Sequence, residues 1–145
     1  MEVGLEMTKA RTIINLAGLE FRQVGKCTLD NSLKSGVRFS TSALQSERVI
    51  YAYVVEDEVK YIGICDNAKT TLKRRMNRYQ GMIGAGTNKR IAGLIKERLR
   101  IGQAVQIFAW QPDAEMTFSS LTVDLIKGLE NPLIQALQPE WNIQG

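Results

Sequence analysis

Hydrophobic residues gather into short runs from about residue 48 onward, and these runs define most of the predicted elements. Residues 48–55, RVIYAYVV, are mostly β-branched or aromatic and are apolar on both faces, which is typical of a central strand. The acidic residues at 56–58 predict a turn, and the VKYIGIC that follows predicts a second strand. We therefore expect a β-hairpin in the middle of the chain.

Helical patterns follow this hairpin. Residues 69–79 contain helix formers and neither glycine nor proline, whereas residues 81–86 are rich in glycine and predict a connector. A second helix is expected over 88–99, because apolar residues recur there at helical spacing. These apolar residues are Ile91, Leu94, Ile95 and Leu99.

The last part of the chain predicts one more strand and one more helix. Residues 104–110 form an apolar run that predicts a strand, and 119–126 fit either a strand or a helix. Proline is tolerated best in the first turn of a helix, so Pro132 predicts a helix that begins near Glu130 and stops at Pro139. The order β-β-α-α-β-α predicts an α/β (α+β) fold, with a small mixed central sheet of about three strands flanked by helices.

Residues 1–47 carry weaker patterns. We expect a short helix over 12–19, a strand over 20–29, and a loop over 31–46, which is rich in Ser, Gly, Asn and Thr. Two parts of the chain are therefore distinguished. An N-terminal extension, 1–47, is a candidate for DNA or subunit contacts, and 48–145 forms the main domain, with the whole packed as a single unit.

The composition of the chain excludes several kinds of active site. The 145 residues include no histidine, which excludes a His-ligated zinc, a Ser-His or Cys-His nucleophile and a histidine base. The two cysteines, Cys27 and Cys65, lie far apart and are expected to be small, buried apolar residues in a reducing compartment. No apolar run approaches the ~18 residues of a membrane span, and the N-terminus has no signal-peptide pattern. We expect a cytoplasmic protein without a membrane partner.

The positive charge is concentrated in one segment. Residues 69–100 hold ten basic residues and one acidic residue, Glu97, so this segment carries +9 and the rest of the chain −5 of the overall +4. Helix faces in contact with solvent usually mix both signs. We therefore predict a surface that binds a polyanion, with DNA or RNA phosphates as the expected partner.

All four tyrosines fall within residues 51–79. If the hairpin turns around Asp57, Tyr53 faces Tyr61 across the two strands. Tyr51 then faces Gly63, which has no side chain and would leave room for the backbone of a ligand. A two-residue turn would break this register, so the arrangement depends on the turn.

Four segments in the same order resemble the motifs of one enzyme family. VIY at 49–51 and YIG at 61–63 resemble the paired motifs of the GIY-YIG nucleases, although Val49 stands where the family name expects glycine. TLKRRMNRY at 71–79 resembles the family's arginine helix, and ENPLIQALQPEWN at 130–142 resembles its glutamate helix and terminal asparagine. Within this family, the chain resembles the small phage endonuclease II branch.

The resemblance implies a metal-dependent phosphodiesterase that cleaves double-stranded DNA. Glu130 would bind one Mg²⁺, for which Mn²⁺ can substitute, and Arg75 would stabilise charge on the scissile phosphate. Tyr51 would position or deprotonate the attacking water. Arg74 is an alternative to Arg75, although Arg75 shares a helix face with Tyr79 at the i+4 position. The supporting residues would be Tyr61, Tyr79, Asn142 and the backbone of Gly63.

The cations next to these motifs are expected to bind DNA: Lys73, Arg74, Arg78, Lys89, Arg90 and Lys96. Tyrosine, with a pKa near 10, is only about 0.1% phenolate at neutral pH, so either nearby cations lower that pKa or the metal supplies the hydroxide.

A double-strand cut needs two active sites or two successive nicks, so we expect a dimer or a tetramer. Restriction or degradation of foreign or host DNA fits this activity, and a non-catalytic DNA- or RNA-binding module on the same fold is the alternative.

Overall fold

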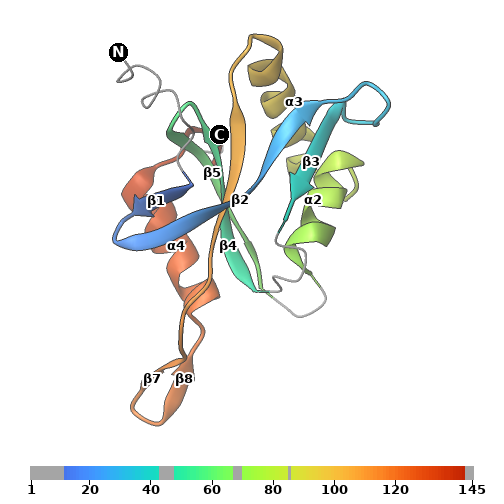
Figure 1. The fold of residues 1–145 in the computed structure, drawn as a ribbon. Coiled ribbons are helices and arrows are strands. Elements are labelled where there is room, and N and C mark those ends of the chain that lie inside the picture. Colours follow the sequence, from blue (N-terminus) through green and yellow to red (C-terminus); the bar gives the residue numbers. More distant parts are fainter. Residues whose placement is uncertain (1–11, 43–47, 67–69, 85, 143–145) are drawn as a thin grey trace, which may run out of the picture.

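The computed structural model describes residues 12–42, 48–66, 70–84 and 86–142. Its centre is a curled antiparallel sheet of six strands with helices on both faces (Figure 1). The strands are β1 (Ile13–Leu16), β2 (Leu19–Leu29), β3 (Val37–Thr41), β4 (Val49–Val55), β5 (Glu58–Cys65) and β6 (Val105–Trp110). Their order is β1-β2-β6-β4-β5, and β3 also pairs with β2.

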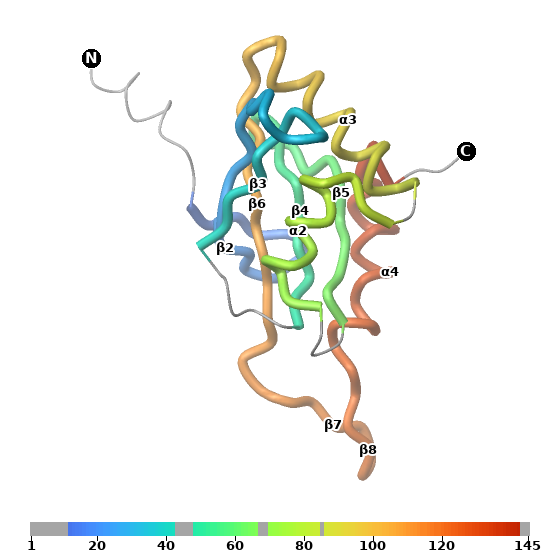
Figure 2. The backbone as a smooth tube through the Cα atoms, turned by 90° about the vertical axis from the view of Figure 1, so that its right-hand side faces the viewer, coloured from blue at the N-terminus to red at the C-terminus, as the bar shows by residue number. Residues whose placement is uncertain are grey.

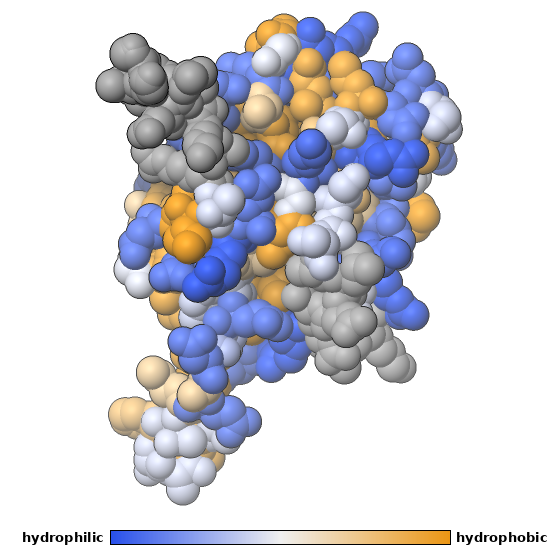
Figure 3. Space-filling model, viewed as in Figure 1, coloured by the Kyte–Doolittle hydropathy of each residue, from blue (hydrophilic) through white to orange (hydrophobic). Residues whose placement is uncertain are grey.

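In the described part of the chain, three α-helices cover this sheet and a small hairpin projects from it. The helices are α2 (Leu72–Gln80), α3 (Gly86–Arg100) and α4 (Leu125–Leu137), and a 3-10 turn, η1 (Glu140–Asn142), follows α4. The hairpin of β7 (Met116–Phe118) and β8 (Leu121–Val123) extends away from the body (Figure 2). Its apolar side chains are exposed at the tip (Figure 3).

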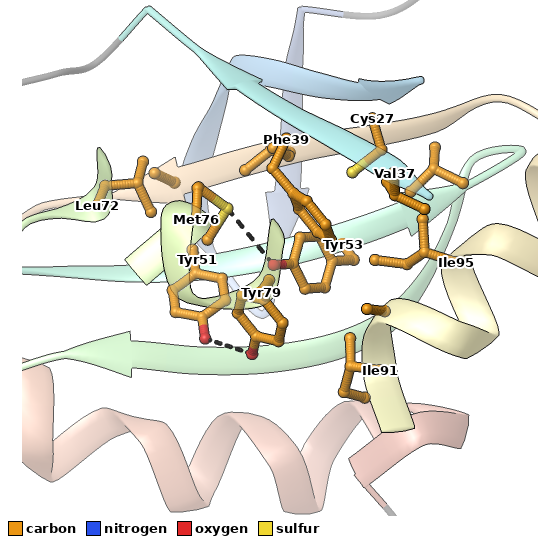
Figure 4. Close-up of a cluster of buried hydrophobic side chains, with 14 of the residues drawn as sticks. Cys27, Val37, Phe39, Tyr51, Tyr53, Leu72, Met76, Tyr79, Ile91 and Ile95 are labelled. Carbon is orange, nitrogen blue, oxygen red and sulfur yellow. Dashed lines mark hydrogen bonds between the residues drawn. The ribbon is translucent and has the colours of Figure 1, made fainter. Parts of the chain in front are cut away.

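Two apolar cores lie on the two faces of the sheet. On one face, α2 and α3 pack over Tyr51, Tyr53 and the other inward side chains of β4 and β6 (Figure 4). On the other face, α4 places Ile126 and Leu133 against a second cluster that includes Ile50 and Phe108. Both faces of β4 are therefore buried, as its continuous apolar sequence predicts. The helices over 72–80 and 86–100 and the strand over 105–110 confirm the corresponding predictions; Lys69, the expected helix start, lies outside the described residues.

The prediction of a mixed sheet of about three strands is wrong, because every described strand pair is antiparallel and residues 13–41 add three strands. The expected strand over 20–29 is present as β2. The expected helix over 12–19 is instead β1 and the turn into β2, in which Ala17 and Gly18 both have positive φ. The expected loop over 31–46 contains β3, and residues 43–47 lie outside the described part of the chain.

The β4–β5 hairpin has a two-residue turn and nevertheless the predicted register. Glu56 and Asp57 form the turn with positive φ at both positions, which suits the twist of a tight hairpin. Val55 therefore pairs with Glu58. This pairing by itself would place the two strands one residue out of the predicted register. An irregularity after Tyr53 restores it, so that Tyr53 pairs with Tyr61 and Tyr51 with Gly63.

The last helix begins five residues earlier than the sequence predicts. Asp124 caps it by accepting a hydrogen bond from the Lys127 N–H at 3.1 Å, and Pro132 lies in the interior of α4. Because Pro132 has no backbone N–H, α4 lacks one of its hydrogen bonds. The cap at Asp124 and the burial of apolar residues on both sides of Pro132 offset this loss. Glu130 is consequently in the second turn of α4, not the first.

The described helices include none that is long and apolar enough to cross a membrane. Cys27 and Cys65 are both buried free thiols, as predicted. Burial raises the pKa of the Cys65 thiol to about 12, so this side chain stays uncharged.

Candidate active site

The four tyrosines form one aromatic cluster between the sheet and α2. Tyr51 and Tyr53 lie on β4 and Tyr79 on α2 (Figure 4). Tyr61 lies on β5. Tyr51 meets Tyr79 edge-on at a centroid distance of 6.3 Å, and Tyr53 stacks against Tyr61 at 6.1 Å. The cluster brings together all the tyrosines that the sequence selects.

Three polar groups converge inside this cluster. The hydroxyls of Tyr51 and Tyr79 are 2.8 Å apart, and Arg75 Nε donates to the Tyr51 hydroxyl at 3.2 Å. Thr71 caps α2 by accepting from the Arg74 N–H, which fixes the start of the helix that carries Arg75 and Tyr79. Among the described residues, it is therefore Arg75 that reaches Tyr51.

Burial keeps the tyrosine hydroxyls protonated. Tyr51 and Tyr79 are both fully buried, and loss of hydration raises the pKa of both phenols above their usual value. Arg75 acts in the opposite direction on the pKa of Tyr51, but burial outweighs it. Of the two alternatives that the sequence leaves open, a tyrosine pKa lowered by nearby cations is therefore disfavoured for Tyr51, because burial outweighs the effect of Arg75 and the phenol stays neutral.

Gly63 is required by the packing of Tyr51. A Cβ atom at Gly63 would lie 2.5 Å from both Cζ and the hydroxyl oxygen of Tyr51. The space above Gly63 is thus filled by this phenol, and the interpretation that it leaves room for the backbone of a ligand is wrong. Glycine at this position lets the Tyr51 side chain lie flat across β5 toward Arg75.

Glu130 approaches the same region from α4, on the other face of the sheet. Its side chain is half-buried, and burial and the charge of Asp66 raise the pKa of its carboxyl, whereas Arg75 lowers it. The charges of Glu130, Asp66 and Arg75 are therefore close enough to influence one another. The site thus combines a cation from α2 with a carboxylate from α4.

Asp66 is the acidic residue near this site that the sequence analysis missed. It follows β5 directly, its carbonyl accepts from Arg48 Nε at 3.2 Å, and its carboxylate lies 4.0 Å from Lys127 Nζ. The sequence does contain one indication of this: Asp66 comes directly after the strand that carries YIG. A residue at the end of that strand must lie near the helix that follows, which carries Arg75.

Asn142 holds the end of the described chain on the edge strand. Its amide accepts from the Ile62 N–H at 2.7 Å and donates to the Ile62 carbonyl at 2.9 Å. This pair of bonds satisfies both backbone groups of Ile62 as a neighbouring strand would. Asn142 therefore fixes the part of β5 between Tyr61 and Gly63.

The predicted DNA-binding cations have different surroundings. Lys73, Arg74, Arg78 and Lys89 are exposed on α2 and α3. Arg90 donates to the Trp141 carbonyl at 3.0 Å, and the Lys96 side chain lies against Gly36, so both also hold parts of the fold together. Arg75 and four of its neighbours line one surface hollow: Thr70, Arg74, Arg75, Asn77 and Arg78.

Comparison with known proteins finds endonucleases that are similar to this chain. The sequence is 35% identical to Endonuclease II of Enterobacteria phage T4 over 103 residues, which span 66% of this chain and 72% of the phage protein. The solved structure of a mutant of bacteriophage T4 EndoII superposes with a TM-score of 0.62 at 27% identity, covering 85% of this chain and 91% of that chain. No protein-family model matches the sequence.

A second solved structure has a similar fold. Restriction endonuclease HPY188I in complex with product DNA superposes with a TM-score of 0.50 at 18% identity, covering 86% of this chain and 78% of that chain. At this identity the likeness concerns the fold alone. The T4 relative, at 35% identity over 72% of its length, establishes the family. The chain belongs to the phage endonuclease II family.

Proposed function

We propose that this protein is an endonuclease of the GIY-YIG type that hydrolyses phosphodiester bonds in double-stranded DNA. The observation that carries the proposal is the contact between Arg75 and Tyr51, with Glu130 near enough for Arg75 to influence its pKa. Membership of the endonuclease II family supports the same reaction. The basic hollow around Arg75 has the charge that a DNA phosphate requires.

Arg75 is the group that we assign to the scissile phosphate. Its Nε is directed to Tyr51, which orients the guanidinium, and the side chain borders the hollow. A guanidinium forms two parallel hydrogen bonds to phosphate oxygens and stabilises the negative charge that develops in the transition state. Tyr79 and Tyr61 support Tyr51 from α2 and β5 by the hydroxyl contact and by ring packing.

We assign Glu130 to a divalent cation, Mg²⁺ with Mn²⁺ as a substitute. The donor set fits a hard cation that is shared with the substrate, because the half-buried Glu130 offers a carboxylate, and phosphate oxygens and waters would complete the coordination. In the described part of the chain there is no group of three or more His, Cys, Asp or Glu that could hold a metal by itself. When bound, the cation would neutralise phosphate charge and lower the pKa of a bound water.

The activation of water follows from the state of the tyrosines. A buried, neutral Tyr51 accepts from Arg75 and shares a hydrogen bond with Tyr79, so its part in the reaction is to position groups. A phenolate base is disfavoured, because burial raises the pKa of Tyr51. We therefore assign Tyr51 a positioning role, and a divalent cation held by Glu130 would supply the acidity that the attacking water needs.

Incubation with supercoiled plasmid tests this proposal. The wild-type protein should convert the plasmid to nicked circles in Mg²⁺ or Mn²⁺ and should leave it intact in EDTA. Salt-dependent binding of the plasmid without any nicking in either metal would support a non-catalytic DNA-binding module instead.

A dimer or a tetramer is part of the proposal. Light scattering with and without DNA tests the oligomeric state, and a monomer in both conditions would contradict this part of the proposal.

A further inference from the structure

A second hollow lies beside the one at Arg75, on the other side of Asn77. Asn77 borders both hollows, so a ligand in one is the neighbour of a ligand in the other. The second hollow is formed by α2, through Lys73, Asn77 and Gln80, and by β3, through Arg38, Ser40 and Thr41. We call it the β3 hollow.

The charge around the two hollows is of one sign. The cations are Lys73 and Arg38 at the β3 hollow and Arg74, Arg75 and Arg78 at the other, and none of the acidic residues that the structure describes borders either. Arg38 is paired with Asp30 at 2.6 Å, whereas Lys73 forms no ion pair with any residue that the structure describes. Lys73 is therefore the cation of the β3 hollow that an incoming anion meets unpaired.

Uncharged donors accompany this cation. Lys73 and Asn77 are one helical turn apart and present an ammonium and an amide on the same face of α2. Ser40 on β3 adds an exposed hydroxyl. Gln80 fixes β3 against α2, because its side-chain oxygen accepts from the Phe39 N–H at 2.8 Å. Lysine, amide and hydroxyl groups together are the set with which proteins bind the DNA backbone.

We propose that the β3 hollow is a second phosphate-binding subsite, which holds the backbone phosphate next to the one bound beside Arg75. This inference rests on the proposed function, because it takes the hollow at Arg75 as the site of the scissile phosphate. DNA would then lie along α2 from Arg75 toward β3. The strand β3, outside the segment that carries the nuclease motifs, would form one wall of the DNA site.

Salt-dependent binding tests the subsite. The affinity for a labelled DNA duplex is measured by fluorescence anisotropy over a range of NaCl concentrations, without divalent metal so that no cleavage occurs. Lys73→Met should reduce the slope of log affinity against log salt by about 0.9, the loss of one phosphate contact. Lys73→Arg should retain the wild-type slope, and Ser40→Ala should weaken binding with the slope unchanged. Lys34→Met, at an exposed lysine that borders neither hollow, is the matched control.

The outcomes separate this inference from the proposed function. A Lys73→Met slope equal to that of Lys34→Met would overturn the subsite, even if the wild-type protein nicks plasmid. A reduced slope for Lys73→Met, restored by Lys73→Arg, would support the subsite even if no nicking occurs in Mg²⁺. Circular dichroism of each variant shows whether it is folded, and Lys73→Gln, which also removes the charge, replaces Lys73→Met in the comparison with Lys34→Met if Lys73→Met does not fold.

Discussion

At the scale of single residues, the hydroxyl of Tyr51 connects the parts of the candidate site. It accepts from Arg75 and lies within hydrogen-bond distance of the Tyr79 hydroxyl, and the whole Tyr51 side chain is withdrawn from solvent. Burial raises the pKa of Tyr51, so the group remains a neutral phenol at physiological pH. The hydrogen bond from Arg75 Nε to this hydroxyl holds the guanidinium in one orientation.

Removing one member of the hydroxyl pair should cost stability. Tyr51→Phe leaves the buried Tyr79 hydroxyl without this partner, so we expect a loss of about 1–3 kcal/mol in the free energy of unfolding by urea. The Tyr51→Phe/Tyr79→Phe double variant should lose less than the sum of the two single variants, because neither hydroxyl then remains buried alone. Additive losses would show that the two hydroxyls do not interact.

Glu130 should oppose folding at neutral pH when no metal is bound. Because burial and Asp66 raise the pKa of Glu130, the folded protein holds this proton more tightly than the unfolded chain. Stability therefore decreases as the pH rises from the ordinary glutamate pKa through the raised value. In EDTA, Glu130→Gln should have a higher Tm than the wild-type protein at neutral pH, and the difference should vanish in acid. A lower Tm at neutral pH would contradict this account.

At the scale of elements, the β4–β5 hairpin determines the geometry of the site. The irregularity after Tyr53 cancels the shift that the two-residue turn introduces, and Tyr51 is thereby placed opposite Gly63. Any residue larger than glycine at that position would displace the Tyr51 ring from Arg75. The hairpin thus contributes both to the apolar core and to the proposed active site.

Gly63→Ala should impair activity and stability together. Its Cβ would overlap the Tyr51 phenol, so we expect plasmid nicking to fall by more than tenfold and the free energy of unfolding to fall by about 1–3 kcal/mol. Gly93→Ala is the control, because a Cβ there meets nothing within 4 Å and lies in α3, where alanine favours the helix. Normal nicking by Gly63→Ala would show that the position of Tyr51 is not important.

The elements that the sequence predicts are those with an uninterrupted pattern. The apolar run of β4, the helical spacing in α3 and the glycine-free stretch of α2 each have one dominant period. The strands β1 and β3, which the sequence does not predict, are short and contain polar residues between the apolar ones. The strand β2 is predicted, although an irregularity between Gln23 and Gly25 interrupts its period. The start of α4 was misplaced because the cap at Asp124 and its apolar contacts outweigh the helix-breaking effect of Pro132.

The candidate site was predictable to a similar extent. Tyr51, Tyr79 and Arg75 lie within motifs whose spacing brings them together on one face. The protonated state of Tyr51 was not predictable, because it depends on burial under α2. The influence of Asp66 on Glu130 depends on the packing of α4 against β5, and no pattern in the sequence shows it.

At the scale of the whole molecule, the site joins groups from both faces of one sheet. Arg75 and Tyr79 come from α2 on one face, and Glu130 comes from α4 on the other. Residues 13–41 complete this sheet, because β2 pairs with β6 along most of the length of β6, and β3 packs against α2. The arrangement of Arg75 and Glu130 therefore depends on the full sheet.

Deletion of residues 1–47 tests this dependence. The truncated chain would expose the edge of β6 that β2 covers, together with apolar surface of α2 and α3, so we expect aggregation or loss of cooperative unfolding. Urea unfolding followed by circular dichroism measures the effect. A truncated chain that unfolds cooperatively and nicks plasmid at the wild-type rate would show that the catalytic groups do not need β1–β3.

The central claim is that Glu130, near Arg75 and Tyr51, serves phosphodiester hydrolysis. Single-turnover nicking of supercoiled plasmid in Mg²⁺ by Glu130→Ala tests it most directly, with Glu97→Ala as a control at an exposed glutamate on α3. We predict that Glu130→Ala binds the plasmid like the wild-type protein but nicks it at least about a hundredfold more slowly, while Glu97→Ala is unaffected. Nicking by Glu130→Ala at the wild-type rate would contradict the claim.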